Sequence, residues 1–202
     1  MFFSLEGSDP RFPFLKRRLE ADGHCVVPNG GHVIAPPRER RGIPYYDDPV
    51  YTLRNAALTA EAAAELLMRS ADRPVAGMRV LVAGRGRVGS LLADTLAALG
   101  ARVTVAARRP DARAAAEIRG HQSVDINQIP DHFEAVLNTV PAPVLSGDYG
   151  GALCIDLAGA PGGWADDTPV LKAPGLPGRY APKAAADILA EAVYRVMEVD
   201  IK

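Results

Sequence analysis

Apolar and polar residues follow two different periods in the middle of the chain, and the pattern predicts a strand, a helix and a second strand. Residues 79–83 form a short apolar run typical of a buried strand. Residues 88–99 carry apolar side chains at helical spacing, and Gly100 favours a helix end there. A second β-like run follows at 102–106.

The same alternation continues on both sides of this unit. Strands are expected at 2–5, 23–27, 122–124, 135–139, 153–157 and 170–173, and helices at 12–21, 59–68, 112–118 and 182–197. Residues 36–49 are rich in Pro, Arg and Asp, a composition typical of a linker. Strands that alternate with helices favour an α/β fold with a doubly wound parallel sheet.

The stretch between the first strand and its helix has the spacing G-x-G-x-x-G. Gly84 permits a tight turn, Gly86 leaves room for a pyrophosphate, and Gly89 lets the helix lie close to the strand. The N–H groups of the first helical turn then face the phosphates. The alternative, a glycine-rich turn without a ligand, is disfavoured by the flanking strand and helix. We expect a Rossmann-like site in which the whole loop binds a dinucleotide: Gly84, Arg85, Gly86, Arg87, Val88 and Gly89.

The end of the second strand indicates which dinucleotide binds. An NAD site usually carries Asp or Glu there, which binds the ribose 2′-hydroxyl. This chain has Ala107 at that place, followed by Arg108 and Arg109, two guanidiniums that could bind a 2′-phosphate. We therefore expect NADP, with NAD as the alternative if the two arginines are ordinary surface residues.

Ligands of such sheets bind at the carboxyl ends of the strands, where this chain has several Gly and Pro clusters. Such clusters let the backbone approach a flat ligand, although they also simply make turns. We expect five of these residues to contact the cofactor: Thr139, Val140, Pro141, Pro174 and Gly175.

Composition narrows the classes of protein that need consideration. The 202 residues suit one domain with a small appendage, and the formal net charge of −1 favours neither nucleic acid nor an anionic membrane. No apolar run approaches the length of about 20 residues that spans a bilayer, and no signal peptide is evident. Cys25 and Cys154 lack metal-binding spacing, so we expect free thiols, no metal and a cytoplasmic location.

Several segments together resemble the A subunit of bacterial dipicolinate synthase. They are Gly42-Ile-Pro-Tyr-Tyr-Asp47, Asn55-Ala-Ala-Leu-Thr-Ala-Glu61, Gly84-Arg-Gly-Arg-Val-Gly89, Asn138-Thr-Val-Pro-Ala142, Ile155-Asp-Leu-Ala158 with Pro161-Gly-Gly163, and Ala173-Pro-Gly-Leu-Pro-Gly-Arg-Tyr-Ala-Pro-Lys183. Their order and spacing agree from about residue 42 onward, and the last segment is the most specific.

The resemblance implies an enzyme that oxidises a dihydrodipicolinate-type intermediate with a nicotinamide cofactor. The family acts with a flavoprotein-like second subunit in sporulating bacteria, and its N-terminal α/β domain has about a hundred residues. Because about 40 residues precede the matching Gly42 here, we expect a truncated N-terminal α/β region and linker at 1–54. A Rossmann domain with flanking helices is expected at 55–202. We also expect the short N-terminal part, with an edge-exposed strand at Phe2 and Phe3, to contact a partner subunit or a second copy of the chain.

Three residues, with Arg179 as a weaker fourth, are candidates for contact with a small dicarboxylate substrate. Lys183, in the first turn of the last helix, could bind a carboxylate or be a solvated lysine, and Arg179 is a weaker second cation. Asn138 could donate a hydrogen bond to the cofactor or substrate, or terminate its strand. Asp156 could act as a general acid or base, although a structural role is favoured.

Three functions remain open at this stage. The first is an NADP-dependent oxidoreductase subunit similar to the A subunit of dipicolinate synthase. The second is a cofactor-binding module without catalysis, and the third is an oxidoreductase for another small carboxylate or cyclic imine. A covalent hydrolytic mechanism is disfavoured because no nucleophile–base pair stands out in the sequence.

Overall fold

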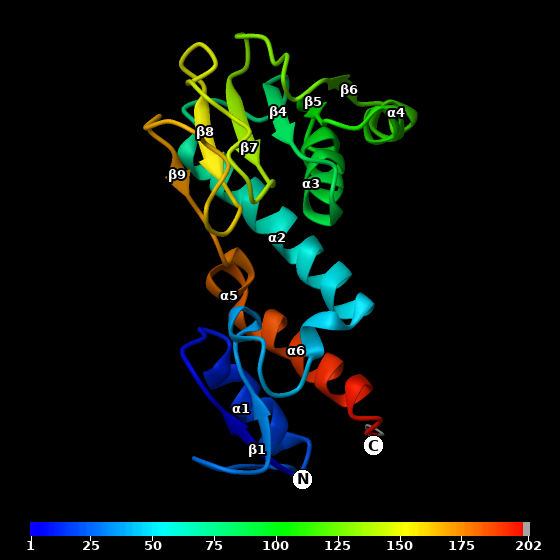
Figure 1. Ribbon diagram of the computed structural model, residues 1–202, viewed down its shortest axis with the longest axis vertical. Helices are drawn as coiled ribbons and strands as arrows, with labels where there is room; N and C mark the ends of the chain where they lie inside the picture. Colours follow the sequence, from blue (N-terminus) through cyan, green and yellow to red (C-terminus); the bar gives the residue numbers. More distant parts are fainter. Residues whose placement is uncertain (200–202) are drawn as a thin grey trace. The chain divides into compact units, whose positions relative to one another are not determined.

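The computed structural model describes residues 1–199 and divides the chain into two compact units (Figure 1). The first contains residues 1–58 and the C-terminal segment from residue 177, and the second contains residues 59–176. The divisions fall within two helices, α2 (Pro49–Ser70) and α5 (Leu176–Tyr180). None of the helices within residues 1–199 combines the length and apolar character needed to cross a membrane.

The second unit is a six-stranded, fully parallel sheet in the order β6-β5-β4-β7-β8-β9. Its strands are β4 (Arg79–Ala83), β5 (Arg102–Ala106), β6 (Gln122–Val124), β7 (Ala135–Asn138), β8 (Leu153–Asp156) and β9 (Leu171–Lys172). The crossover helices are α3 (Arg87–Ala98) and α4 (Pro110–Ile118). The strand order reverses beside β4, as in a Rossmann fold, so the expected fold class is confirmed.

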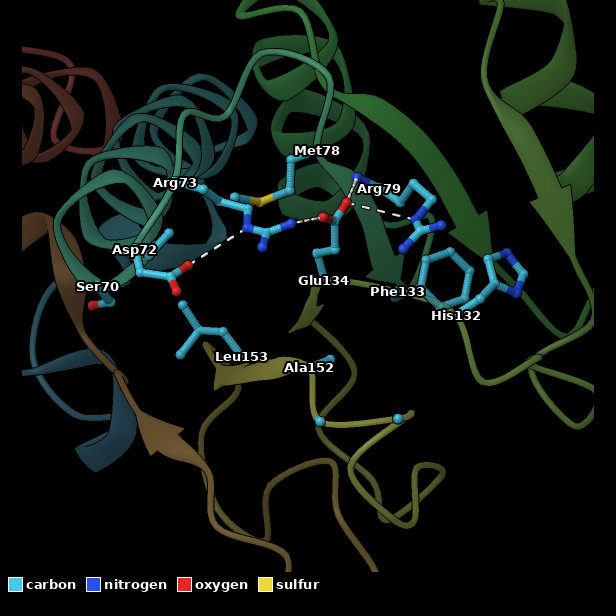
Figure 2. Close-up of a pocket in the computed structure, with 13 residues that line it drawn as sticks. Ser70, Asp72, Arg73, Met78, Arg79, His132, Phe133, Glu134, Ala152 and Leu153 are labelled. Atoms are coloured by element: carbon cyan, nitrogen blue, oxygen red, sulfur yellow. Dashed lines mark hydrogen bonds and ion pairs between the residues drawn. The ribbon is translucent and has the colours of Figure 1, made fainter.

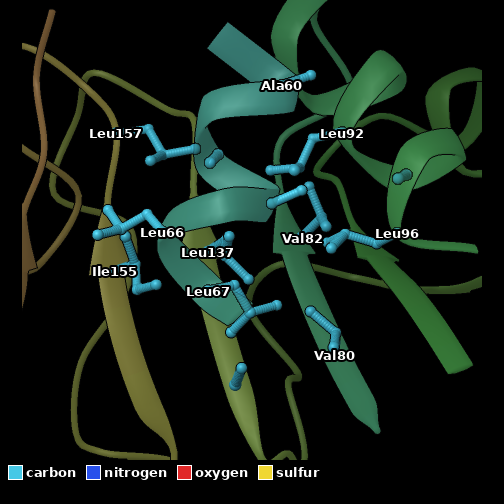
Figure 3. Packing of buried hydrophobic residues seen from close by; sticks show 14 of the residues in the cluster. Ala60, Leu66, Leu67, Val80, Val82, Leu92, Leu96, Leu137, Ile155 and Leu157 are labelled. Carbon is cyan, nitrogen blue, oxygen red and sulfur yellow. The ribbon is translucent and has the colours of Figure 1, made fainter. Parts of the chain in front are cut away.

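Alternating residues of the central strands β5, β4, β7 and β8 pack into different cores. Val80 and Val82 of β4 lie in the core that includes the buried side of α2 and Leu92 and Leu96 of α3 (Figure 3). Leu81, on the other face of the sheet, lies in a core completed by residues of irregular segments: Ile126, Phe133, Leu145 and Tyr149. Both faces of the sheet are therefore buried, which explains why its strands read as continuous apolar runs.

The first unit contains a smaller parallel sheet and two complete α-helices, besides its parts of α2 and α5. Its strands, in the order β2-β1-β3, are β1 (Phe2–Leu5), β2 (Cys25–Val26) and β3 (His32–Ile34). The helices are α1 (Phe12–Ala21) and α6 (Pro182–Val196), which lie side by side in Figure 1. The expectation that β1 has unpaired edges is wrong, because β2 and β3 pair with it on its two sides.

The last helix departs from the expected domain boundaries, because α6 belongs to the first unit and not to the Rossmann domain. Its buried residues Leu189 and Val193 share a core with Phe3 and Leu15. Polar contacts add to this apolar packing, since the Tyr194 hydroxyl donates to Asp22 at 2.8 Å. The side chains that cover α1 thus come from the opposite end of the chain.

The segment expected to be a linker is partly core. Ile43 and Tyr45 are buried in the first unit, and the Tyr45 hydroxyl donates to the Ala35 carbonyl at 2.9 Å. Two short 3₁₀ helices occupy this segment, η1 (Pro37–Glu39) and η2 (Tyr45–Asp47). Helix α2 then begins at Pro49, ten residues before the expected helix start at residue 59, because the Asp48 carboxylate accepts the Tyr51 N–H at 2.9 Å.

Candidate dinucleotide-binding site

The three glycines of the loop between β4 and α3 have different surroundings. Gly84 has a φ of +102°, and an added Cβ would lie 2.5 Å from Thr139 Oγ1. A Cβ on Gly89 would collide with the carbonyl oxygen of Gly84. At Gly86, by contrast, nothing lies within 4 Å of an added Cβ. Protein atoms therefore leave no room for a side chain at Gly84 or Gly89. The space beside Gly86 is free, and a pyrophosphate would approach the backbone there.

The open side of the loop coincides with a helix N-terminus. Gly86 is the N-cap of α3, with extended backbone angles. The first-turn N–H groups of a helix lack intrahelical acceptors and carry partial positive charge. Arg87 and Val88 belong to this turn, and Arg87 is exposed. The arrangement can bind an anionic phosphate without a metal, and residues 1–199 contain no cluster of His, Cys, Asp or Glu suited to a metal ion.

The end of β7 forms the neighbouring wall of the loop. Thr139 Oγ1 donates to the Ala83 carbonyl at 2.8 Å, and the Thr139 N–H donates to the same oxygen at 2.9 Å. Thr139 and Val140 are both half-buried, whereas Pro141 is exposed. The structure therefore brings Thr139 and Val140 to the glycine loop, as their place at a strand end suggested.

Asn138 and Asp156 form a buried pair at the ends of β7 and β8. Asn138 is fully buried and Asp156 is 4% exposed, and Asn138 Nδ2 donates to Asp156 Oδ1 at 2.7 Å. The Val140 N–H donates to Asn138 Oδ1 at 3.0 Å, and the Gly163 N–H donates to Asp156 Oδ2 at 2.8 Å. Both side chains point into the protein, and their hydrogen bonds to backbone N–H groups hold the two loops that follow the strands in place. Their polar atoms are engaged within the fold, which agrees with the structural roles considered for both residues.

Arginines gather at the end of β5. Ala107 is buried, whereas Arg108 and Arg109 are exposed. Arg109 forms an ion pair with Asp111 at 3.0 Å, and both of these side chains are at least 70% exposed. The expected acid is absent from this strand end, as the sequence indicated.

Arg113 is a further arginine of this region that the sequence analysis did not single out. Its Nη1 donates to the carbonyls of Ala107 and Arg108 and to Asp125, each at 2.9 Å. The Asn127 backbone N–H and the Arg113 guanidinium hold the pKa of Asp125 below its usual value of 3.8, although partial desolvation opposes them. The signal was present in the sequence, because Arg113 lies one helical turn after Arg109 and Asp125 directly follows a predicted strand.

The remaining expected residues lie in two places. Pro174 and Gly175 are exposed after β9 in the second unit. Lys183 is an exposed residue of α6 in the first unit, and it has no ion-pair partner within residues 1–199. The glycine loop and Lys183 therefore belong to different units.

A cavity of about 550 Å³ lies at the opposite, amino-terminal edge of the second sheet (Figure 2). Glu134 is at its centre, where its carboxylate accepts the Arg79 N–H at 2.8 Å and forms ion pairs with Arg73 and Arg79. The ring of His132 stacks on Phe133 with 4.6 Å between centroids. None of the residues expected to bind cofactor or substrate lines this cavity.

Comparison with known proteins agrees with this geometry. The family model of the D-isomer specific 2-hydroxyacid dehydrogenase NAD binding domain matches residues 52–144. The A subunit of dipicolinate synthase from Bacillus subtilis (strain 168) is 32% identical over 193 residues, which cover 86% of this chain. The chain resembles the A subunit of dipicolinate synthase. The resemblance inferred from the sequence motifs is thereby confirmed.

Solved structures extend the similarity to the A subunit of dipicolinate synthase. The Bacillus halodurans protein superposes with a TM-score of 0.80 at 22% identity, covering 97% of both chains. The B. subtilis protein gives a TM-score of 0.71 at 26% identity, covering 97% of this chain and 64% of that one. The chain thus spans 65% of the length of the B. subtilis sequence relative and 64% of the B. subtilis chain in the solved structure, slightly less than two thirds of each. The family model and the sequence relative support a nicotinamide dinucleotide cofactor and an oxidoreductase-type subunit.

Proposed function

We propose that this chain is an NADP-dependent oxidoreductase subunit that converts a dihydrodipicolinate-type intermediate to dipicolinate. The observation that carries the proposal is the glycine loop, which is open at Gly86 and lies beside β5, a strand followed by Ala107 and Arg108 instead of an acid. A bound NADP⁺ would accept a hydride from the dihydro ring as a proton leaves, which yields the aromatic ring and NADPH.

The protein's part in this reaction is to bind and orient the two reactants. The first turn of α3 would hold the pyrophosphate, and Thr139 and Val140 would border it at the end of β7. Asn138 and Asp156 would act as positioning residues, because they fix the backbone of the loops after β7 and β8. Lys183 is our candidate for binding a substrate carboxylate, since its ammonium is exposed and has no ion-pair partner within residues 1–199.

The partners follow from the relatives rather than from contacts in this chain. The B. subtilis relative is, by its name, one subunit of dipicolinate synthase. We infer that this chain also acts within an assembly, with a flavoprotein-like second subunit, a second copy of itself or both. The proposed setting is the bacterial cytoplasm during sporulation.

A second candidate function is a cofactor-binding module without catalysis. The inward-facing side chains of Asn138 and Asp156 favour it, because they leave Lys183 as the one of the three catalytic candidates whose polar group is exposed. An oxidoreductase for another small carboxylate would use the same cofactor site.

Cofactor choice and turnover are tested separately. Calorimetric titration should show at least about tenfold tighter binding of NADP than of NAD, since a hydrogen bond to a charged group contributes about 1.5–3 kcal/mol. The preference should fall by about tenfold or more in the double variant Arg108→Ala, Arg109→Ala. Equal binding of both cofactors by the natural chain would refute the NADP assignment.

The reaction itself is tested by mixing the chain with NADP and synthetic dihydrodipicolinate and following the absorbance of the reduced cofactor. Turnover supports the enzyme. Cofactor binding without turnover, both alone and with the partner protein present, supports the non-catalytic module.

A further inference from the structure

Within residues 1–199, the side chain of Arg85 in the glycine loop has an unsatisfied hydrogen-bond donor. Arg85 lies between Gly84 and Gly86, and its side chain extends to α4, where Nη2 donates to the Ala115 carbonyl at 3.3 Å. Its Nε atom is buried and has no hydrogen-bond partner in the described chain. The guanidinium is thus held beside α4 by one long hydrogen bond.

Such an arrangement is unfavourable unless an acceptor arrives. A buried donor on a charged group that lacks an acceptor costs about 1–3 kcal/mol or more. Natural structures satisfy most buried polar atoms, so an exception near a candidate site points to a missing ligand. A long hydrogen bond of 3.3 Å to a neutral carbonyl is a weak substitute for an anionic acceptor.

The arginines at the neighbouring strand end are not equivalent. Arg109 is already paired with Asp111, and Arg113 is engaged by Asp125 and by the carbonyls of Ala107 and Arg108. The Arg108 guanidinium, by contrast, is exposed and has no ion-pair partner within residues 1–199. Within residues 1–199, Arg85 thus keeps a buried donor without an acceptor, and Arg108 presents an unpaired guanidinium at the next strand end.

We propose that Arg85 and Arg108, one from the loop after β4 and one from the loop after β5, together bind the ribose 2′-phosphate of NADP; this rests on the proposed NADP-dependent function. Parallel β4 and β5 are adjacent and in register, with Ala83 opposite Ala106, so both loops leave the same edge of the sheet. Two guanidiniums can share the oxygens of one phosphate through charge-assisted hydrogen bonds. Arg113 positions the Arg108 backbone, and Arg109 contributes little.

The test compares single alanine variants of the full chain by calorimetric titration with NADP, NAD and 2′,5′-ADP. We expect Arg85→Ala and Arg108→Ala each to weaken NADP and 2′,5′-ADP at least tenfold and NAD less than threefold. Arg102→Ala, an exposed arginine at the start of β5 and not at the strand end that carries Arg108, is the matched control and should change each affinity less than twofold. Arg85→Lys keeps the charge but loses the planar fork and should fall between Arg85→Ala and the natural chain. Thermal melting of each variant confirms that it is folded.

The outcomes separate this inference from the function on which it rests. If the natural chain does not prefer NADP, the NADP assignment and this inference both fall. If it prefers NADP and Arg85→Ala keeps that preference, this inference alone is overturned. An equal loss of NAD and NADP in Arg85→Ala would also overturn it, because Arg85 would then contact a part shared by both cofactors.

Discussion

Gly86 and Gly89 lie three residues apart, but a side chain at Gly86 would enter open space whereas one at Gly89 would collide with protein atoms. Gly86 has a φ of −80° and a ψ of −169°, which suit any residue, and open space where a Cβ would lie. We predict that Gly86→Val stays folded but loses at least tenfold in cofactor affinity, because the branched side chain occupies the path of the pyrophosphate. Calorimetry and thermal melting would measure the two effects.

Gly89→Val is the contrasting control. Its side chain would strike the Gly84 carbonyl, so this variant should lose stability by about 1–3 kcal/mol or more. If Gly86→Val binds cofactor as well as the natural chain does, the dinucleotide site lies elsewhere.

Lys183 offers a second comparison at the scale of single residues. Because it is exposed and unpaired within residues 1–199, its replacement should change the free energy of unfolding by less than about 0.5 kcal/mol. We predict that Lys183→Met melts like the natural chain but has a raised KM for the dicarboxylate or a lowered kcat. A large drop in melting temperature with unchanged kinetics would assign the residue to structure instead.

At the scale of elements, the Asp22 carboxylate after the end of α1 adds a hydrogen bond from α6 to the apolar packing of the two helices. Burial alone would raise the pKa of Asp22, but hydrogen bonds from Tyr194 and Arg18 outweigh burial and lower that pKa below its usual value of 3.8. The folded state therefore favours ionised Asp22. The resulting stabilisation is present above about pH 4 and is lost as the pH falls through the lowered pKa.

We predict that Asp22→Asn lowers the free energy of unfolding by about 1 kcal/mol at pH 7 and by much less near pH 2. Denaturant unfolding at several pH values would measure this difference. Asp47→Asn is a suitable control, because the Asp47 side chain is 64% exposed. This variant would lose only an ion pair with Arg40, whose charged atoms are 3.9 Å apart. If Asp22→Asn lowered the free energy of unfolding by the same amount at every pH, ionised Asp22 would not be the source of the stabilisation.

Helices and strands could be predicted from the sequence where the spacing of nearby apolar residues and glycines determined them. The glycine loop, α3 and the central strands were anticipated because apolar spacing and glycine positions act over a few residues. The three-residue strand β3 was missed, because it exists through pairing with β1 some 29 residues away, Phe3 opposite His32. The buried hydrogen bond between Asn138 and Asp156 was likewise invisible, since it depends on the register of two strands separated by a long loop.

At the scale of the whole molecule, activity should depend on assembly. Phe2 is 61% exposed on the middle strand of the small sheet, and an exposed aromatic side chain is suited to a protein interface. We predict that the chain alone binds NADP but turns over dihydrodipicolinate slowly or not at all. Light scattering and activity assays at several concentrations, with and without the partner protein, would follow both properties.

Two surface variants would locate the contact. Phe2→Ser should weaken association, whereas Ile118→Ser, at an 87% exposed position of the second unit, should leave it unchanged. A stable monomer with full activity would refute the dependence on a partner.

The placement of α6 also bears on the order in which the protein matures at the ribosome. The second unit is one continuous stretch, so its sheet can be completed as soon as residue 176 has been synthesised. The first unit combines residues 1–58 with α6, so Phe3, Leu15 and Leu19 are covered only once α6 has been synthesised. A premature stop just before Pro182 would therefore spare the middle of the chain and damage the fold of its beginning.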